Sequence, residues 1–496
     1  MLSFISLLTL VSAVLAGPLH KYDGSGPVVN RTTCDGHTYS YRGLEGYGFL
    51  PASFRDKFGD TVSTGSSIAV SNWKAVRDSY KATLYALPDR GWNTNGTTAY
   101  QPRVHRYSVT FTPAAAYPSP PNFALSYETS ILLTDPAGVP VSGLDPTGTL
   151  CYPGDLCIPA ASFPGDGFGG AGPGGKRGSL DPEGLVVASD GTFWISDEYG
   201  PYLYHFSSSG RMLHAVAPPN SLLPIRDGKV NFASNNPPIY DPSQIPQPAN
   251  PTSGRANNQG FEGLTYVAKE HALYTMLQSG SINNGGEDKS TNRYTTLLKY
   301  SLDSKRWVGE WTVPLPQFQD PTKKPTAKPR TAASSEIHAL GSGRFLSLSR
   351  DGFGRLGDRT QSVYRHADVF SINSATDILG KFDDFTSSFA PAGVLDPSVT
   401  PAEYCQFLDF NVPTELAKFG LLNGGAVDSD QLMNEKWEGL ALVPVAGKKR
   451  EFWLIASSDN DFITQDGWFN FGRDSYKDAS GGNLLNQFLV FRVSLH

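Results

Sequence analysis

Four glutamates recur in similar surroundings along the sequence, and carboxylates repeated in this way can hold a metal ion. Each opens a segment with one plan: an apolar run, a turn of small or polar residues, and a second apolar run that ends in polar residues. This plan is typical of a β-hairpin, and equivalent positions in a repeat are equivalent in space. We therefore expect four carboxylates to converge, those of Glu183, Glu262, Glu336 and Glu438.

The returning strands of these hairpins end in further charged groups. Converging carboxylates repel one another unless a cation lies among them, and clustered oxygen ligands suit Ca²⁺ or a similar hard metal. Arg350 is a candidate internal counter-charge. The expected metal ligands are Glu183, Asp197, Glu198, Glu262, Glu336, Asp351, Glu438, Asp459 and Asp461. The alternative is a scaffold role, in which each glutamate bonds neighbouring backbone amides at a turn, and such a role would also repeat.

Elements that could position these residues are short strands joined by turns. The chain has 51 Gly and 37 Pro in 496 residues, a balance that favours turns over long helices. The repeated hairpins predict an all-β fold, a β-propeller of six or seven blades with long inserted loops between them. Short helices are expected only near residues 69–81 and 413–422.

The N-terminus has the pattern of a secretory signal peptide. An apolar run ends in Val14, Leu15 and Ala16, with small residues where signal peptidase cleaves. The run of roughly 15 residues is short for a membrane span, which needs about 20. We expect a signal peptide at residues 1–16, an N-terminal segment at 17–42, and a secreted, extracellular protein. The sequons at Asn30 and Asn95 fit an exported glycoprotein.

The four cysteines would meet oxidising conditions after export and can pair in three ways. Loop length favours a bridge between Cys151 and Cys157, which enclose a turn-rich stretch. That choice leaves Cys34 to pair with Cys405, which would tie an early segment to a late one and close a ring.

Composition and motifs argue against several classes of protein. The formal net charge of −6 offers no basic surface, so we expect neither a nucleic acid nor a membrane as partner. The letters of GxGxxG occur from Gly167 to Gly172, but prolines flank them and no helix pattern follows. The sequence has neither a GxSxG nucleophile elbow nor an HExxH zinc motif.

The segments DPEGL with ISDEYGPYLYHFSSSG, GFEGL, SRDGFG, and WEGLAL with SSDNDF together resemble the phytase-like family, described by esterase-like activity of phytase. The similarity runs from about residue 43 to 492 in family order, so residues 43–496 are assigned to one phytase-like β-propeller domain. The matching motif positions are Glu183, Asp197, Glu198, Glu262, Arg350, Asp351, Glu438, Asp459 and Asp461. The chain departs from the family at Ser349, where many relatives have a glutamate.

The resemblance implies hydrolysis of phosphate esters, with phytate as a candidate substrate of a monomeric enzyme. A calcium-loaded acidic centre would then neutralise the phosphate and activate a water. The expected catalytic residues are Glu183, Asp197, Glu262, Arg350 and Glu438. Two alternatives stay open: a lactonase or carboxylesterase propeller that polarises a carbonyl, and a non-catalytic secreted propeller that binds a glycan or a protein.

Overall fold

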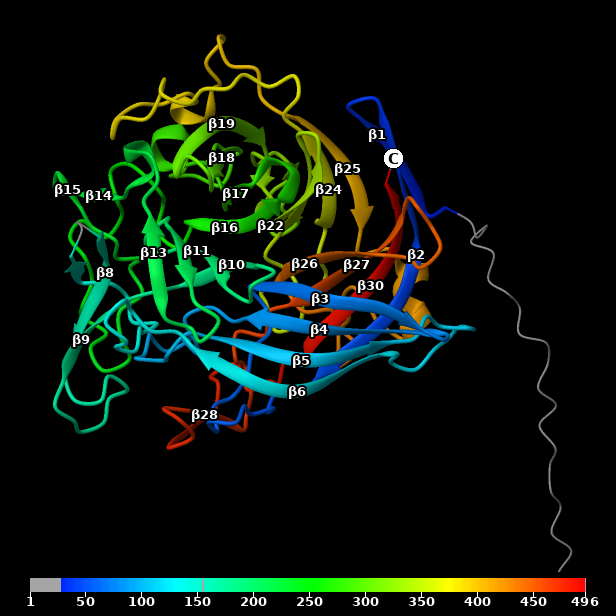
Figure 1. The fold of residues 1–496 in the computed structure, drawn as a ribbon, viewed down its shortest axis with the longest axis horizontal. Helices are drawn as coiled ribbons and strands as arrows, with labels where there is room; N and C mark the ends of the chain where they lie inside the picture. Colours follow the sequence, from blue (N-terminus) through cyan, green and yellow to red (C-terminus); the bar gives the residue numbers. More distant parts are fainter. Residues whose placement is uncertain (1–27, 154–155, 496) are drawn as a thin grey trace, which may run out of the picture.

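Antiparallel strands make up nearly all regular structure of the chain. The computed structural model describes residues 28–153 and 156–495. Five sheets of four or five strands dominate it (Figure 1). We number them by their first strands in the order β3, β10, β16, β22 and β26. The α-helix among the described residues is one turn long, α1 at Pro413–Leu416. No helix in these ranges has the length and apolar character that a membrane crossing requires.

The strands of each sheet follow one another as neighbours. Sheet 1 contains β3 (Ser67–Val76), β4 (Ser79–Leu87), β5 (Arg103–Phe111) and β6 (Phe123–Leu132). Sheet 2 contains β10 (Pro182–Val187), β11 (Phe193–Asp197), β12 (Leu203–Phe206) and β13 (Met212–Val216). Sheet 3 contains β16 (Phe261–Val267), β17 (Ala272–Leu277), β18 (Tyr294–Ser301) and β19 (Arg306–Pro314). Sheet 4 contains β22 (Ala333–Gly341), β23 (Arg344–Arg350), β24 (Arg365–Ser371) and β25 (Glu403–Asp409).

Sheet 5 joins the two ends of the chain. Its order is β26 (Trp437–Pro444), β27 (Glu451–Ser458), β30 (Asn486–Leu495), β2 (His37–Leu50) and β1 (Asn30–Cys34). The N-terminal β2 therefore pairs with the C-terminal β30, blue beside red in Figure 1. β1 and β2 turn at Asp35-Gly36, both with positive φ, which suits a tight two-residue hairpin.

Smaller elements lie between the five sheets. A three-stranded sheet holds β7 (Gly148–Tyr152), β8 (Leu156–Phe163) and β9 (Gly175–Gly178). Two-stranded pairs are β14 (Ile225–Arg226) with β15 (Lys229–Val230), β20 (Gln317–Phe318) with β21 (Arg330–Thr331), and β28 (Gly467–Phe469) with β29 (Asp474–Tyr476). Single 3₁₀ turns lie at Asn220–Leu222, Ala268–Glu270, Ile282–Asn284, Pro391–Gly393 and Ala417–Phe419.

The first strands of the five sheets surround a common axis in a propeller-like arrangement. Strand β3 contacts β10, β10 contacts β16, β16 contacts β22, β22 contacts β26, and β26 returns to β3. Glycines permit this close approach. A Cβ at Gly263 would lie 2.7 Å from the backbone nitrogen of Ile337, and one at Gly439 would lie 3.2 Å from that of Ile68. The glycine that follows Glu183, Glu262 and Glu438 is thus required by strand packing around the axis.

The hydrophobic core is divided among the interfaces of this ring. One cluster of buried side chains lies between each pair of neighbouring sheets. For example, Trp194 and Leu203 of sheet 2 pack against Leu273 and Leu298 of sheet 3. Each sheet lies between two others, so its aromatic and branched side chains are buried on both faces. Burial of these apolar side chains stabilises the ring.

Both disulfide predictions are confirmed. Cys34 of β1 is bonded to Cys405 of β25, with a sequence separation of 371 residues, so the bridge joins sheet 5 to sheet 4. Cys151 of β7 is bonded to Cys157 of β8. The two sequon asparagines, Asn30 and Asn95, are exposed. The expected signal peptide lies outside the described residues.

Three expectations about the fold need correction. The ring holds five sheets instead of six or seven, because much of the chain's length lies in connections such as residues 133–181 and 372–402. The expected helix at 69–81 is the hairpin of β3 and β4, which turns at Arg77 with φ 56°. Residues 30–42, placed before the main domain by sequence, form β1 and part of β2 within sheet 5.

Candidate functional site

Three of the repeated glutamates stand at bulges near the start of innermost strands. Glu262 is the extra residue between the paired positions Phe261 and Gly263, and Glu438 is the extra residue between Trp437 and Gly439. The bulge in β10 falls between Pro182 and Leu185 and so includes Glu183. A bulge re-aims a side chain out of the regular alternation. It brings these glutamates together at one end of the ring.

The carboxylates of this end form a cluster that we call the acidic centre. Oxygens of Asp181, Glu183 and Glu198 all lie within 4.8 Å of one another, and all three residues are buried. Oxygens of a neighbouring group, Asp89, Asp459 and Asp461, also lie within 4.8 Å of one another, and Asp461 is partly buried. We define the acidic centre as these six residues together with Glu262 and Glu438.

Burial and mutual repulsion control the protonation of this cluster. Burial, followed by the charge of Glu262, raises the pKa of Glu183 well above its ordinary value. Burial, followed by the charges of Glu198 and Glu438, does the same for the pKa of Glu262. Burial also raises the pKa of Glu198 to about 7, opposed by the positive charges of Arg90 and Arg255.

Four basic side chains compensate part of the negative charge. The Arg90 Nη1 atom lies 2.5 Å from Asp181 Oδ2. The Lys436 Nζ atom lies 2.6 Å from Asp461 Oδ1 and 3.5 Å from Asp459 Oδ2. The third, Arg350, places Nη2 2.5 Å from Glu438 Oε1, and the fourth, Arg255, donates to backbone carbonyls. Lys436 therefore offsets part of the negative charge of Asp459 and Asp461, and Arg90 offsets part of that of the trio Asp181, Glu183 and Glu198.

Asp197 and Asp351, both expected ligands, have their oxygens engaged by backbone amides. Asp197 accepts from the backbone nitrogen of Asp181 at 2.7 Å and of Gly200 at 3.0 Å. Asp351 Oδ2 accepts from the nitrogens of Val363 at 2.6 Å and Tyr364 at 2.9 Å, and Oδ1 accepts from Phe353. These two carboxylates hold the loops that carry Asp181, Glu198 and Arg350.

Glu336 does not join the acidic centre. In β22 the bulge residue is Ser335, and Glu336 pairs with Leu348 as Gly263 pairs with Met276. Glu336 thus occupies the glycine position of the repeat. Its carboxylate accepts from Ser67 Oγ at 2.6 Å and from the nitrogens of Leu264 at 3.0 Å and Ile337 at 2.9 Å. It links β22 to β16 and β3 instead of facing the other glutamates.

Sequence reasoning missed Asp181, Arg90, Asp89 and Lys436. A signal was present for two of them. Asp181 opens the DPEGL motif two positions before Glu183, and Lys436 lies two positions before Glu438. Asp89 and Arg90 belong to the loop after β4, far from any repeated motif. Only the closed ring brings that loop to the acidic centre.

The residues around Glu183 fit a hard divalent cation. Within residues 28–153 and 156–495, Glu198 Oε1 and Glu262 Oε2 are buried and have no hydrogen-bond partner. An unpartnered buried carboxylate oxygen is costly unless a proton or a cation compensates it. The donor set consists of oxygens, as Ca²⁺ and Mg²⁺ prefer.

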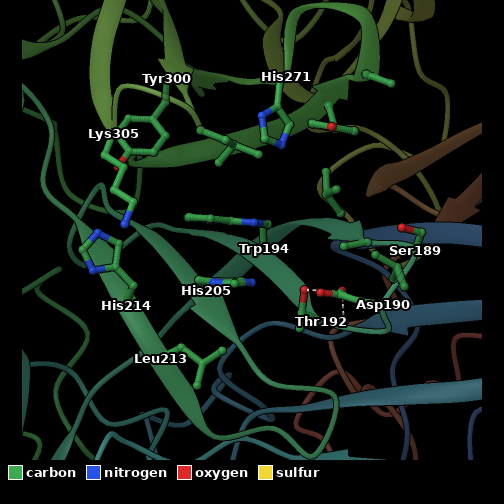
Figure 2. Close-up of a pocket in the computed structure, with 16 residues that line it drawn as sticks. Ser189, Asp190, Thr192, Trp194, His205, Leu213, His214, His271, Tyr300 and Lys305 are labelled. Carbon is green, nitrogen blue, oxygen red and sulfur yellow. Dashed lines mark hydrogen bonds between the residues drawn. The ribbon is translucent and has the colours of Figure 1, made fainter.

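A cavity of about 890 Å³ lies at the other end of the same strands, between sheets 2 and 3. It begins at Val186 and Val187, whereas Glu183 stands at the opposite end of β10. In Figure 2 the rings of Trp194 and His205 lie parallel, with centroids 4.4 Å apart. At the rim of the cavity, Thr192 Oγ1 donates a hydrogen bond to Asp190 Oδ1. This cavity contains none of the acidic centre's carboxylates.

Comparisons with known proteins give one family and one full-length relative. The family model for phytase-like proteins, described by esterase-like activity of phytase, matches residues 70–462. A protein of Arthroderma benhamiae named "Uncharacterized secreted protein" is 46% identical over 496 residues, covering 94% of this chain and 97% of that protein.

Similarity to solved structures is low. An alpha-L-arabinofuranosidase from Podospora anserina, in complex with cellotriose, aligns with 90% of this chain and 97% of its own at 8% identity and TM-score 0.29. A gluconolactonase from Xanthomonas campestris aligns with 88% of this chain and 98% of its own at 9% identity and TM-score 0.24. Values this low bear on neither fold nor function.

Proposed function

This chain belongs to the phytase-like family, and we propose that it is a secreted hydrolase of phosphoric esters whose acidic centre uses a bound calcium ion. The observation that carries the proposal is the buried trio Asp181, Glu183 and Glu198, whose oxygens lie within 4.8 Å of one another. When ionised, three carboxylates paired with one arginine carry a net negative charge that would repel a phosphate in the absence of a cation. The secreted relative and the two disulfides support an extracellular location.

The trio would hold the cation, and each neighbouring residue has a separate task. When bound, the cation would offset the negative charge of the phosphate and would lower the pKa of a bound water. Glu183 and Glu198 offer the ligand oxygens. Asp197 fixes the trio through the backbone nitrogen of Asp181. Arg90 restrains Asp181 from the other side.

Glu262 is suited to move the proton. Its Oε1 accepts from Gln278 Nε2, while its Oε2 has no partner among the described residues. The free oxygen would accept a proton from the attacking water as that water's oxygen forms a bond to phosphorus. The bond between phosphorus and the alcohol oxygen breaks, and the departing alcohol takes up the proton that Glu262 received, which returns Glu262 to its carboxylate form. Burial raises the pKa of Glu262, which makes its carboxylate a stronger base.

Arg350 is placed to stabilise charge on the phosphoryl oxygens. Its Nη2 contacts Glu438 Oε1, and its Nε donates to Ser335 Oγ at 3.2 Å. These contacts fix the guanidinium plane at the edge of the acidic centre. Glu438 would therefore act mainly by orienting Arg350.

The test is phosphate release by the purified secreted protein from 4-nitrophenyl phosphate and from phytate, with calcium and after chelation. We expect release that requires calcium and falls at least about 100-fold in Glu262→Gln, with the fold intact. Unchanged release after removal of divalent ions would refute the metal's role. Turnover of 4-nitrophenyl butyrate in the absence of any phosphate release would indicate the carboxylesterase alternative.

A further inference from the structure

A second cavity adjoins the acidic centre between sheets 3 and 4. We call it the polar chamber; its volume is about 340 Å³. Two of its lining residues, Gln278 and Arg350, contact carboxylates of the acidic centre directly, at Glu262 and Glu438. The chamber and the acidic centre therefore share a wall.

A substrate needs a route to the acidic centre, because its carboxylates are covered. The exposed fraction is 6% for Glu183, 2% for Glu262 and 4% for Glu438. The polar chamber leads to two of these side chains, because its lining residues Gln278 and Arg350 contact Glu262 and Glu438. An ester whose phosphoryl group lies at Arg350 would extend its alcohol part into the chamber.

The chamber offers hydrogen-bonding groups of both kinds. Asn292 is 4% exposed, and its Nδ2 donates to Ser279 Oγ at 3.0 Å. Its Oδ1 is buried and accepts no hydrogen bond from any residue that the structure describes. Ser279 Oγ in turn donates to Gln259 Oε1, so the Asn292 amide is held in one orientation. This leaves an oriented acceptor in the chamber wall that a hydroxyl group of a ligand would satisfy.

Lys289 supplies a positive charge that no described carboxylate within 4.0 Å neutralises. The two arginines of the chamber are paired: Arg330 with Asp320 at 2.6 Å, and Arg350 with Glu438. The lining carboxylates include Asp351, which is engaged by backbone amides, and also Asp358 and Glu435. The backbone oxygen of Lys289 accepts from the nitrogen of Thr331 at 2.7 Å, which fixes the base of this side chain on β21.

From this arrangement we propose that the polar chamber binds the alcohol part of the ester and selects hydroxylated, hydrophilic alcohols over aromatic or aliphatic ones. This inference rests on the proposed function. Asn292 Oδ1 accepts from a hydroxyl of the alcohol, and Lys289 donates to an oxygen of the alcohol or of a substituent on it. Both residues determine specificity and take no part in bond breaking.

The test compares two esters that share a phosphoryl group and differ in the alcohol, glycerol 2-phosphate and 4-nitrophenyl phosphate. For Lys289→Gln and Asn292→Leu we expect KM for glycerol 2-phosphate to rise about tenfold or more, as for a lost hydrogen bond, with kcat little changed. KM for 4-nitrophenyl phosphate should change less than about twofold. Lys323→Gln, an exposed lysine between β20 and β21 that does not line the chamber, is the matched control.

Equal effects on both esters, or no effect on either, would overturn the specificity role. Because Asn292 is buried, its variant is checked by thermal unfolding, and the exposed Lys289 provides the variant that leaves the fold intact. Calorimetric binding of glycerol 2-phosphate to Glu262→Gln in calcium separates the two proposals. If Lys289→Gln weakens the binding of glycerol 2-phosphate but the parent protein hydrolyses no phosphate ester, the proposed function is refuted and the role of the chamber in binding is supported. Turnover with binding that neither variant weakens would refute the chamber alone.

Discussion

Ser67 Oγ donates a hydrogen bond of 2.6 Å to Glu336 Oε2 at the axis of the ring. The two residues belong to β3 and β22, which are not neighbours in the cycle of innermost strands. Ser67 also accepts from the nitrogen of Leu185, and Glu336 accepts from that of Leu264. This pair therefore joins four of the five innermost strands through one buried contact.

Removal of this contact should destabilise the whole ring. Ser67→Ala leaves a buried carboxylate oxygen and a buried amide without a partner, so we expect the free energy of unfolding to fall by about 1–3 kcal/mol. Urea unfolding measures it. Ser66→Ala, at a neighbouring buried serine whose hydroxyl has no partner among the described residues, is the control and should change little. Equal effects of the two variants would contradict the role of the pair.

Glu336 should also make stability depend on pH. Burial raises its pKa to about 8, although Ser67 and two backbone amides oppose the shift. The folded state therefore binds more protons than the unfolded state between about pH 4.5 and 8, so this group's contribution is present below pH 4.5 and is lost as the pH rises through 8. We expect a shallower decline of stability over this range in Glu336→Gln, by at most about 1.4 kcal/mol per pH unit. If the free energy of unfolding falls equally steeply with pH in Glu336→Gln and in the parent protein, Glu336 does not cause the pH dependence.

Substitutions of Glu183, a member of the acidic centre, and of Asp197, which adjoins it, should change the response to calcium differently. Asp197→Asn removes one acceptor for a buried amide and should lower the melting temperature with and without calcium, while the rise caused by calcium persists. Glu183→Gln should abolish that rise, because a bound ion stabilises only the folded protein. Differential scanning calorimetry distinguishes these results. Loss of the calcium effect in Asp197→Asn alone would reverse the two roles.

The bridge between Cys34 and Cys405 should stabilise the fold without affecting the site. It joins the outer strands β1 and β25, away from the acidic centre. We expect the double change Cys34→Ser with Cys405→Ser to cost about 2–5 kcal/mol. The pair Cys151→Ser with Cys157→Ser, whose loop is short, should cost less. Chemical unfolding compares them, and a larger loss from the short loop would contradict the prediction.

The sequence was sufficient to predict what depends on local pattern. Hairpins that begin at Glu183, Glu262 and Glu438 have the predicted position, and both disulfides follow from cysteine number and spacing. The number of sheets could not be predicted, because connections and strands contribute to chain length alike. Figure 1 shows how much of the chain lies outside the five sheets.

The errors at the candidate site have two physical causes, a local shift in strand register and the closure of the ring. The repeat of letters aligns Glu336 with Glu262, but the bulge in β22 includes Ser335 and shifts the glutamate by one residue. A shift of one residue turns a side chain to the other side of a strand. Arg90 and Asp89 reach the acidic centre only through the ring, so no local pattern indicates them.

The most direct test of the central claim is a calorimetric titration of calcium into the purified protein after chelation. The account predicts one strongly bound ion per chain, with binding lost in the double variant Glu183→Gln with Glu198→Gln. Binding should persist in Asp459→Asn, because Asp459 lies outside the trio and already pairs with Lys436. Absence of binding in the parent protein, or binding unchanged when Glu183 and Glu198 are replaced, would contradict a cation site in the acidic centre.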